Sequence, residues 1–289
     1  GHGLIGNSLP ALYLGCDLLI EPAFSTEMAQ CFGEFLDARG ITFFSSVPSL
    51  WSSVLPFAAP PISKKIRSAF CASADLSVAN WKSVKNWLGS QVDFRNVYGI
   101  TEAGSWISAL PAGVEYREPG LVGSGWNCEF RIDPANQEIL VKAPYVMRGY
   151  HSDPIATEAA FSGDFLRTGD LGRLDPELGL QLLGRSKDQI NRGGLKISPV
   201  EVEERLRAYP GVMDCCVFAL PDPIAGQVVA AALVFSGKHP GSRELKDFCR
   251  ETLSEFKIPE KFYFVREIPR SSRGKVNRSE IFGLLKKEP

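Results

Sequence analysis

Short β-rich runs alternate with helical runs over residues 41–98, and this alternation restricts the possible folds more than any other feature of the chain. The β-rich runs are Ile41–Ser45, Ile66–Cys71 and Val92–Tyr98, and the helical runs are Ser49–Leu55 and Val78–Leu88. A strand that is followed by a helix and then by another strand is typical of a sheet with parallel strands. The pattern therefore predicts an α/β fold for this part of the chain.

The flanking segments have a different character. Leu9–Leu19 is an apolar run that we expect to pass from helix to strand, and Ser25–Arg39 predicts one amphipathic helix that ends at a glycine. Over Gly120–Leu183, short strands such as Glu138–Lys142 and Gln181–Leu183 are separated by Gly, Pro and Asp. These turn residues predict a β-rich lobe that follows the α/β part.

A third region begins near Gly184. Ser198, Pro199 and Glu201 predict a helix start, with Ser198 as N-cap, Pro199 at the first helical position and Glu201 completing a capping box. The elements expected after the link are a helix to Ala208, strands Cys215–Ala219 and Val228–Phe235, a helix Arg243–Phe256, a strand Lys261–Val265 and a helix from Arg278. This region predicts a separate, small α+β domain.

The polar link Gly184–Asp188 (GRSKD) marks the expected domain boundary, because it lies between two apolar runs. We therefore expect a larger domain over residues 1–184 and a smaller one over residues 185–289.

Composition excludes several classes of function. With 32 basic and 33 acidic residues, the formal charge is −1, so no overall field favours nucleic acid. No apolar run is long enough for a membrane span, and the first residues lack the features of a signal peptide. The seven cysteines form no CxxC pair and no zinc spacing, and an odd, unpatterned set indicates a reducing compartment. We therefore expect a cytoplasmic protein.

Two motifs carry groups suited to a phosphate or a sugar. In Tyr98-Gly99-Ile100-Thr101-Glu102, a glycine permits close approach of a ligand, and a hydroxyl beside a carboxylate suits a phosphate with its magnesium. In Thr168–Gly172 (TGDLG), Asp170 could accept two hydrogen bonds from vicinal ribose hydroxyls. Taken alone, each motif is better explained by an ordinary strand end or turn.

Two further motifs lie in the third region. The run from Gly184 to Glu203 (GRSKDQINRGGLKISPVEVE) contains the charged link and two adjacent glycines, which allow a tight hairpin or a close ligand approach. Pro269–Arg278 (PRSSRGKVNR) is a polar loop in which Lys275 follows a glycine and could reach a site as a mobile charge. A surface hairpin and a solvated loop lysine are the alternative interpretations.

Together, in this order and with these gaps, the four motifs resemble the later core motifs of the adenylate-forming superfamily, which includes acyl-CoA synthetases, peptide-synthetase adenylation domains and luciferases. The resemblance extends from His2 to Arg278. It implies the C-terminal part of a large α/β adenylation domain with a β-rich lobe, and then a small mobile α+β domain. It also implies ATP or AMP, Mg²⁺, and coenzyme A or a phosphopantetheine thiol as cofactors.

The resemblance assigns roles in the large domain. It implies that Ser73 and Ala74 belong to the adenine and acyl-pocket strand, although Ala72 and Asp75 replace the common Gly and Pro there. By the same resemblance, Tyr98 stacks on adenine. The remaining roles in this motif are a backbone approach at Gly99, an α-phosphate contact by Thr101 and Mg²⁺ binding by Glu102.

The remaining roles fall in the last two motifs and in Asp170. The resemblance implies that Asp170 binds the ribose hydroxyls, that Arg185 fixes ribose and phosphate, and that Lys275 offsets charge at the α-phosphate. Lys187 occupies the position of the domain hinge. After rotation of the small domain, the Gly193-Gly194 turn would line the path of a pantetheine thiol.

The substrate is expected to be a small-molecule carboxylic acid without an amino group, because Gly1–Gly6 has no carboxylate that could hold one. His2 resembles the residue that borders the acyl pocket of acyl- and aryl-CoA ligases, although it could equally be a hydrogen-bonded residue near a chain end. Gly99, Ile100 and Trp106 are further candidates for this pocket, with a core position as the alternative for Trp106. An aryl and a short or medium acyl group are both compatible.

The family's phosphate loop, rich in Ser, Thr and Gly and ending in Lys, is not found in these residues. We therefore expect an N-terminal segment to be missing, so that activity of this chain alone is an open question. The alternatives to a CoA ligase are the same adenylation with an acyl carrier protein as acceptor, and a non-catalytic nucleotide-binding or interaction module.

Overall fold

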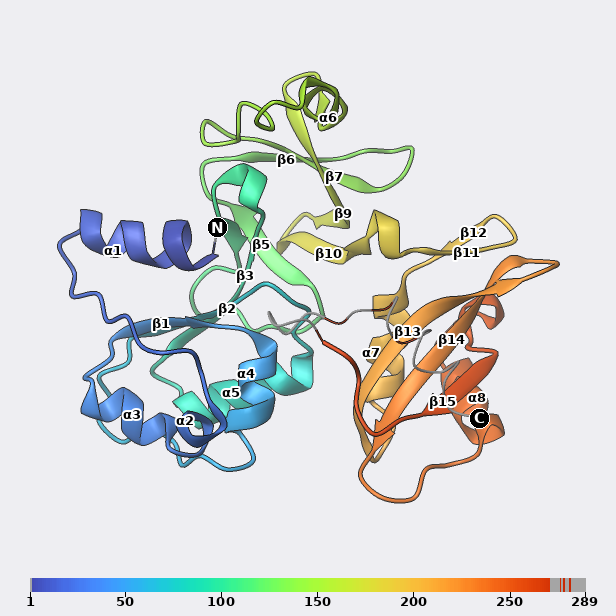
Figure 1. Cartoon of the computed structure of the whole chain (residues 1–289), viewed down its shortest axis with the longest axis horizontal. Coiled ribbons are helices and arrows are strands. Elements are labelled where there is room, and N and C mark those ends of the chain that lie inside the picture. Colours follow the sequence, from blue (N-terminus) through green and yellow to red (C-terminus); the bar gives the residue numbers. More distant parts are fainter. Residues whose placement is uncertain (1, 271–275, 277, 279–280, 282–289) are drawn as a thin grey trace. The chain divides into compact units, whose positions relative to one another are not determined.

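The computed structural model describes residues 2–270, 276, 278 and 281. The chain forms two compact units: residues 1–168 with 172–182, and residues 169–171 with 183–289. The expected α/β class is confirmed, since the chain contains parallel strands, helices that connect them and a β-rich portion (Figure 1). Each unit has its own apolar cores and is described separately below.

The first unit contains most of a ten-stranded sheet with strand order β1-β2-β3-β4-β5-β10-β9-β7-β6, and β8 pairs with β9. Its helices are η1 (His2–Ser8), α1 (Leu9–Tyr13), α2 (Thr26–Gln30), α3 (Phe32–Ala38), α4 (Pro48–Val54), α5 (Val78–Leu88), η2 (Thr101–Ala103) and α6 (Pro154–Ala159). Its strands are β1 (Phe43–Ser46), β2 (Ser68–Cys71), β3 (Asp93–Gly99), β4 (Trp106–Ala109), β5 (Leu121–Gly125), β6 (Glu129–Ile132), β7 (Glu138–Lys142) and β8 (Phe161–Ser162). β9 (Phe165–Asp175) and β10 (Gly179–Arg185) contribute residues to both units.

In the first unit, β1, β2 and β3 pair in parallel, and the connections between them carry α4 and α5. Trp51 of α4, Trp87 of α5 and Phe32 of α3 meet in one buried cluster against β2 and β3. The indole N–H of Trp51 donates to Ser46 Oγ at 2.9 Å, which satisfies its polar atom inside the core. Because β2 and β3 are parallel, their carboxyl ends lie at the same edge of the sheet.

The second unit contains a five-stranded sheet in which β13 (Val212–Asp222) and β14 (Gly226–Phe235) form a long antiparallel hairpin. Its other elements are η3 (Ser186–Asp188), β11 (Ile190–Arg192), β12 (Leu195–Ile197), α7 (Pro199–Arg207), α8 (Ser242–Arg250), η4 (Glu255–Lys257) and β15 (Lys261–Phe264). Along β13, Cys215 and Val217 belong to one apolar cluster, and Cys216 and Phe218 belong to another. The alternation follows from the period of two in a strand, so both faces of this hairpin are buried.

Two predicted helices are wrong in extent. The helix expected over Ser25–Arg39 is divided at Cys31, whose backbone is not helical, into α2 and α3. The second piece brings Gly33 so close to the chain that a Cβ atom there would lie 2.1 Å from the Ala59 carbonyl oxygen. The helix expected over Arg243–Phe256 ends at Arg250 and is followed by the separate turn η4.

Two further local predictions are wrong. The run Leu9–Leu19 forms only the short helix α1, with no strand after it. The capping box at Ser198 is absent, because its hydroxyl donates to the Leu183 carbonyl oxygen at 2.5 Å and Glu201 pairs with Lys257. Pro199 does occupy the first helical turn of α7. The helix expected from Arg278 lies mostly outside the described residues.

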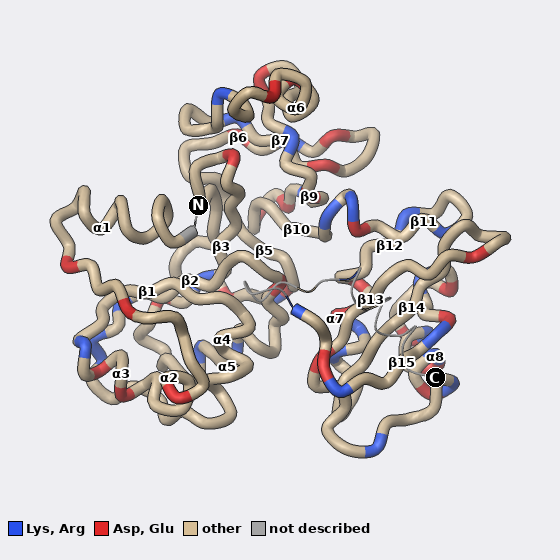
Figure 2. The backbone as a smooth tube through the Cα atoms, in the orientation of Figure 1, with Lys and Arg blue, Asp and Glu red and all other residues tan. Residues whose placement is uncertain are grey.

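Charged residues of both signs occur along both units, whereas η1 and α1 contain no Lys, Arg, Asp or Glu (Figure 2). Leu12, Tyr13 and Leu14 on this path are largely exposed. Among the described helices, none is long and apolar enough to cross a membrane.

Candidate functional site

The first motif begins where β3 ends. Gly99 is its last residue, and a Cβ atom there would lie 1.8 Å from the Ser105 carbonyl oxygen, so only glycine fits this position. The chain then turns through η2, which places Thr101 at the surface and Glu102 in a half-buried position. A hydroxyl and a carboxylate thus stand side by side at the carboxyl end of a parallel strand.

Glu102 is held from a second loop. The Tyr150 hydroxyl donates to Glu102 Oε1 at 3.1 Å, and the Met147 amide donates to the Glu102 carbonyl oxygen at 2.7 Å. Burial and this hydrogen bond to Glu102 raise the pKa of Tyr150 above its usual value. Tyr150 therefore keeps its proton near neutral pH and remains a donor to the carboxylate.

The aromatic residues of this motif are packed into the sheet. Tyr98 is only 6% exposed and belongs to a cluster with Ala103 and Ile107, against which Ile100 also packs. Trp106 lies edge-on to Phe70, with ring centroids 5.3 Å apart. Both positions contribute to the core of the first unit in the described state.

The segment after β2 lies at the same sheet edge as Gly99, because β2 and β3 pair in parallel. Ser73 and Ala74 are exposed there, and Ser73 has a φ of 75°, a conformation that L-residues rarely adopt. Such backbone strain is common at ligand-binding positions. The side chain of His2 lies outside the described part of the chain.

The second unit brings two predicted residues together. Asp170 on β9 accepts a hydrogen bond from Arg185 Nε, at the end of β10, at 2.7 Å. The Asp170 side chain is 11% exposed and that of Arg185 is 45% exposed. The carboxylate is therefore fixed and largely buried, while the arginine side chain is nearly half exposed.

The link and the glycine pair have clear local structures. Lys187 is exposed within η3. Gly193 and Gly194 form the two-residue turn between β11 and β12, with φ values of 57° and 88°. Asn191 Oδ1 accepts a hydrogen bond from the Gly194 amide at 3.0 Å. The predicted tight hairpin is confirmed, and its glycines leave the backbone unshielded by side chains.

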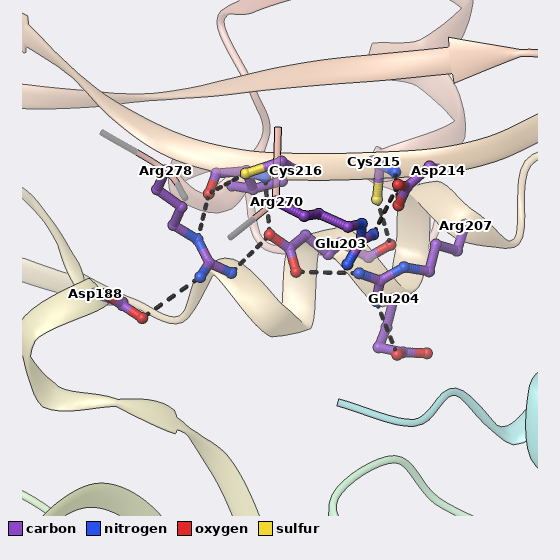
Figure 3. Close-up of polar contacts among 10 residues, drawn as sticks. Asp188, Glu203, Glu204, Arg207, Asp214, Cys215, Cys216, Arg270 and Arg278 are labelled. Carbon is purple, nitrogen blue, oxygen red and sulfur yellow. Dashed lines mark hydrogen bonds and ion pairs between the residues drawn. The ribbon is translucent and has the colours of Figure 1, made fainter. Parts of the chain in front are cut away.

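The last motif is described only at its flanks, and Lys275 lies outside the described residues. Arg270 and Val276 form an isolated antiparallel bridge around it. Arg278 donates to the buried carboxylate of Glu203 at 2.8 Å, and its guanidinium lies 3.4 Å from the Asp188 carboxylate (Figure 3). These contacts join the motif to α7 and η3.

The sequence analysis missed Tyr150, Glu203 and Arg278 as parts of these arrangements. Glu203 was visible only as one of several acidic residues on an amphipathic helix, and nothing in its spacing distinguishes it from Glu204. The helix α6 was also missed, although Asp153 before Pro154 is a standard start signal, and Asp153 indeed accepts from the Ala156 amide.

The residues at Glu102 are compatible with magnesium. Within the described ranges, no group of three His, Cys, Asp or Glu residues could form a metal cage. Mg²⁺ usually binds through one or two carboxylates together with substrate phosphates. A single carboxylate such as Glu102, oriented by a tyrosine and next to a threonine hydroxyl, fits that mode.

Comparison with known proteins places this geometry in a family. The model described as AMP-binding enzyme matches residues 2–151, and the model described as AMP-binding enzyme C-terminal domain matches residues 201–275. The chain belongs to the AMP-binding enzyme family. The resemblance to adenylate-forming enzymes is thereby confirmed.

Members of the family with similar sequences include two kinds of CoA ligase. An oxalate–CoA ligase of Arabidopsis thaliana is 30% identical over 96% of this chain and 56% of its own length. A 2-succinylbenzoate–CoA ligase of Bacillus cereus is 31% identical over 94% of this chain and 57% of its own. The chain thus spans about half the length of the curated relatives that it matches.

A solved structure of a family member shows the same arrangement of elements. The o-succinylbenzoate CoA synthetase of Bacillus subtilis, in complex with its acyl-adenylate intermediate, superposes with a TM-score of 0.79. It is 29% identical, over 94% of this chain and 56% of that chain. An α/β fold with a large N-terminal and a small C-terminal domain is common to such members of the AMP-binding enzyme family.

Proposed function

We propose that this chain is the adenylate-binding and C-terminal part of an AMP-forming acid–thiol ligase. The reaction activates a carboxylic acid that has no amino group and transfers the acyl group to coenzyme A. The observation that carries the proposal is the succession, on one chain, of the two family matches over residues 2–151 and 201–275. The names of the relatives, which are CoA ligases, support the choice of acceptor.

In the first half-reaction, an oxygen of the substrate carboxylate attacks the α-phosphorus of ATP, and pyrophosphate leaves. Thr101 would contact the α-phosphate, and Lys275 would offset the charge that develops there. Mg²⁺, when bound, would supply Lewis acidity at the phosphate oxygens. The Tyr150 hydrogen bond to Glu102 supports the role of Glu102 in holding that ion, because it orients the carboxylate.

Four of the predicted residues have properties suited to a nucleoside. The Asp170 carboxylate is suited to accept from the two ribose hydroxyls, and the exposed guanidinium of Arg185 is suited to ribose and phosphate. The exposed pair Ser73 and Ala74 would approach the adenine. Stacking on adenine by Tyr98, which is 6% exposed, would require the ring to become more accessible.

In the second half-reaction, the thiol attacks the acyl carbonyl carbon, AMP leaves, and the thiol proton passes to solvent. The open backbone at Gly193 and Gly194 would permit close approach of the pantetheine arm. Lys187, exposed in the turn η3, would absorb the backbone change of the hinge. A phosphopantetheine carrier protein presents the same arm and is tested below as an acceptor.

The acid would lie near Gly99, Ile100 and Trp106, with His2 as a further neighbour. Oxalate and 2-succinylbenzoate, named for the relatives, both carry two carboxyl groups. Small dicarboxylates and aryl dicarboxylates therefore belong in the substrate panel beside simple aryl and acyl acids.

The test measures acid-dependent AMP release from ATP, Mg²⁺ and CoA with this panel. One arm uses the chain alone, and a second adds an N-terminal segment from an intact relative. A Lys275→Ala variant is the control, and a loaded carrier protein replaces CoA in a parallel assay. Acid-dependent release that Lys275→Ala abolishes would support the ligase. No release in either arm, with the chain folded and AMP bound, would instead favour a non-catalytic module.

A further inference from the structure

Described residues on either side of Lys275 in the sequence contact the same strand. Before it, Arg270 forms an ion pair with Asp214 of β13 at 2.7 Å. After it, Arg278 Nε donates to the Val217 carbonyl oxygen, also on β13, at 3.0 Å. The bridge between Arg270 and Val276 brings the two flanks together. Both flanks are therefore placed along β13 (Figure 3).

β13 pairs with β14 on one side and, among the described strands, with none on the other. On that open side, Glu203 Oε1 accepts from the Val217 amide at 2.9 Å, and Arg278 donates to the carbonyl of the same residue. The ion pair thus provides the acceptor and the donor that a neighbouring strand would provide. Since backbone groups are fixed in space, this contact sets the register of Arg278 along the strand.

The Glu203–Arg278 pair is strongly held. Glu203 is 2% exposed, and it also accepts from Arg207 of the same helix at 3.2 Å. Burial, the largest single influence, opposes the charge on Arg278, but Glu203, Cys216 and Asp188 together outweigh it and raise the pKa of Arg278 above its usual value. A charged arginine in such surroundings is retained in one place, because leaving either buried charge unpaired is strongly unfavourable.

The same guanidinium contacts the turn η3. Arg278 Nη1 lies 3.4 Å from the carboxylate of Asp188, the last residue of η3 and the neighbour of Lys187 (Figure 3). One side chain therefore contacts α7, β13 and the turn that precedes the domain's first strand.

We propose that Arg278 is a positioning residue that fixes the segment bearing Lys275 against β13 and links it to the turn η3. Lys275 comes three positions before this anchor in the sequence, and three residue steps span at most about 10 Å. The role rests on the proposed function, in which Lys275 acts in adenylation and leaves the site for thioester formation. Arg278 accordingly matters for the first half-reaction more than for the second.

The test compares Arg278→Gln with Arg207→Gln in the full chain. Both variants remove a guanidinium from Glu203, but only the first releases the segment with Lys275. Amide hydrogen exchange of peptides that cover residues 268–281, and the rate of acetylation of Lys275, report on the segment whether or not the chain is active. We expect both rates to rise at least about tenfold in Arg278→Gln and to change little in Arg207→Gln.

The second readout separates the half-reactions. Adenylation is measured as pyrophosphate release, and thioester formation is measured from a synthetic acyl-adenylate with CoA. We expect Arg278→Gln to slow adenylation about 10–100-fold, a range typical of misplaced catalytic groups, with thioester formation nearly unchanged. Arg278→Lys should recover part of the loss, because it keeps the charge but not the fork of donors.

Two results would overturn the role proposed for Arg278, and a third would overturn the proposed function. Equal effects of Arg278→Gln and Arg207→Gln on exchange would overturn the proposal, as would equal slowing of both half-reactions. If the parent chain makes no adenylate in any arm, the proposed function fails. The exchange and acetylation rates would then still show whether Arg278 anchors the segment.

Discussion

Two arginine–carboxylate pairs in the second unit have similar distances but differ in how deeply their side chains are buried. Arg185 contacts Asp170 at 2.7 Å, and Arg278 contacts Glu203 at 2.8 Å. The Arg185 side chain is 45% exposed, whereas Glu203 is almost fully buried and binds two arginines and a backbone amide. The short distance alone therefore does not distinguish a ligand-binding pair from a structural one.

The difference lies in what would happen if a ligand competed for the pair. Arg185 is open to solvent, so exchanging one contact for a phosphate or a ribose hydroxyl involves little desolvation. Arg278 could not leave Glu203 without stranding a buried carboxylate. We infer that the pair with the more exposed arginine is suited to binding, and that the pair with the more buried arginine is suited to holding the chain in place.

The largest expected effect is on stability. Glu203→Ala should lower the free energy of unfolding by about 3–5 kcal/mol, because it leaves buried arginine groups without their carboxylate. Denaturation in urea measures this loss. The matched control is Glu204→Ala on the same helix, where the pair with Arg207 is more exposed and the expected loss is at most about 1 kcal/mol. Equal losses would contradict the contrast between buried and exposed pairs.

The next effect is on binding. Asp170→Asn should weaken AMP binding about 10–100-fold, since hydrogen bonds to a charged group contribute about 1.5–3 kcal/mol. Because the Asp170 side chain is only 11% exposed, urea denaturation is measured alongside to establish that the variant remains folded. Titration calorimetry with AMP measures the affinity. Asp164→Asn removes an exposed carboxylate that pairs with Lys142, and should leave the affinity unchanged. A stable Asp170→Asn variant with parental affinity would contradict the ribose role.

The third prediction concerns the stability of the folded chain at alkaline pH, through a buried thiol next to Glu203. Cys215, which lies 3.4 Å from the Glu203 carbonyl oxygen, is buried, and burial raises the pKa of its thiol. Above pH 8.5 the unfolded chain loses this proton while the folded chain keeps it, so stability falls as pH rises. The expected loss is about 1–2 kcal/mol per buried thiol between pH 8 and pH 10.

The check is the slope of stability against pH. Cys215→Ala should have a shallower slope than the parent chain. Cys16→Ala, at an exposed thiol, should keep the parental slope. Parallel slopes for all three proteins would show that the buried thiol remains accessible to ionisation.

The smallest effect concerns the exposed contact at Glu102. Tyr150→Phe removes one hydrogen bond at a residue that is 42% exposed. We expect a stability change of about 0.5 kcal/mol or less, in line with exposed polar contacts. If Glu102 holds Mg²⁺ as proposed, the dependence of AMP binding on Mg²⁺ should shift by about 2–5-fold, because the orientation of its carboxylate is partly lost. A calorimetric titration at several Mg²⁺ concentrations measures the shift.

The sequence predicted the features that depend on local pattern. The alternation over residues 41–98 correctly predicted β1, β2 and β3 with their two connecting helices. The hydrophobic periodicity of a strand or a helix depends only on residues close together in the sequence. The turn at Gly193 and Gly194 was equally predictable, since only glycine tolerates both φ values. The sequence predicted a nucleotide-binding role for Asp170 and another for Arg185. It did not predict that the two side chains contact each other.

The predictions that were wrong or missing depended on contacts between residues that are far apart in the sequence. The helix breaks at Cys31, and Gly33 packs closely on Ala59. A helical pattern in residues 25–39 contains no information about this contact with a later segment. Ser198 donates to Leu183, a residue 15 positions earlier, and its side chain makes no capping hydrogen bond. The partners of Arg278 come from three separate segments, so neither spacing nor composition could identify them.

The occupied edge at Val217 also bears on how the protein avoids self-association. An open strand edge is a template on which another chain can add a strand. At Val217, the carboxylate and the guanidinium already use both backbone groups, so an incoming strand would find no pairing there. Loss of the pair would remove this block as well as stability. Variants at Glu203 should therefore aggregate at lower concentrations than equally destabilised variants elsewhere in the same sheet.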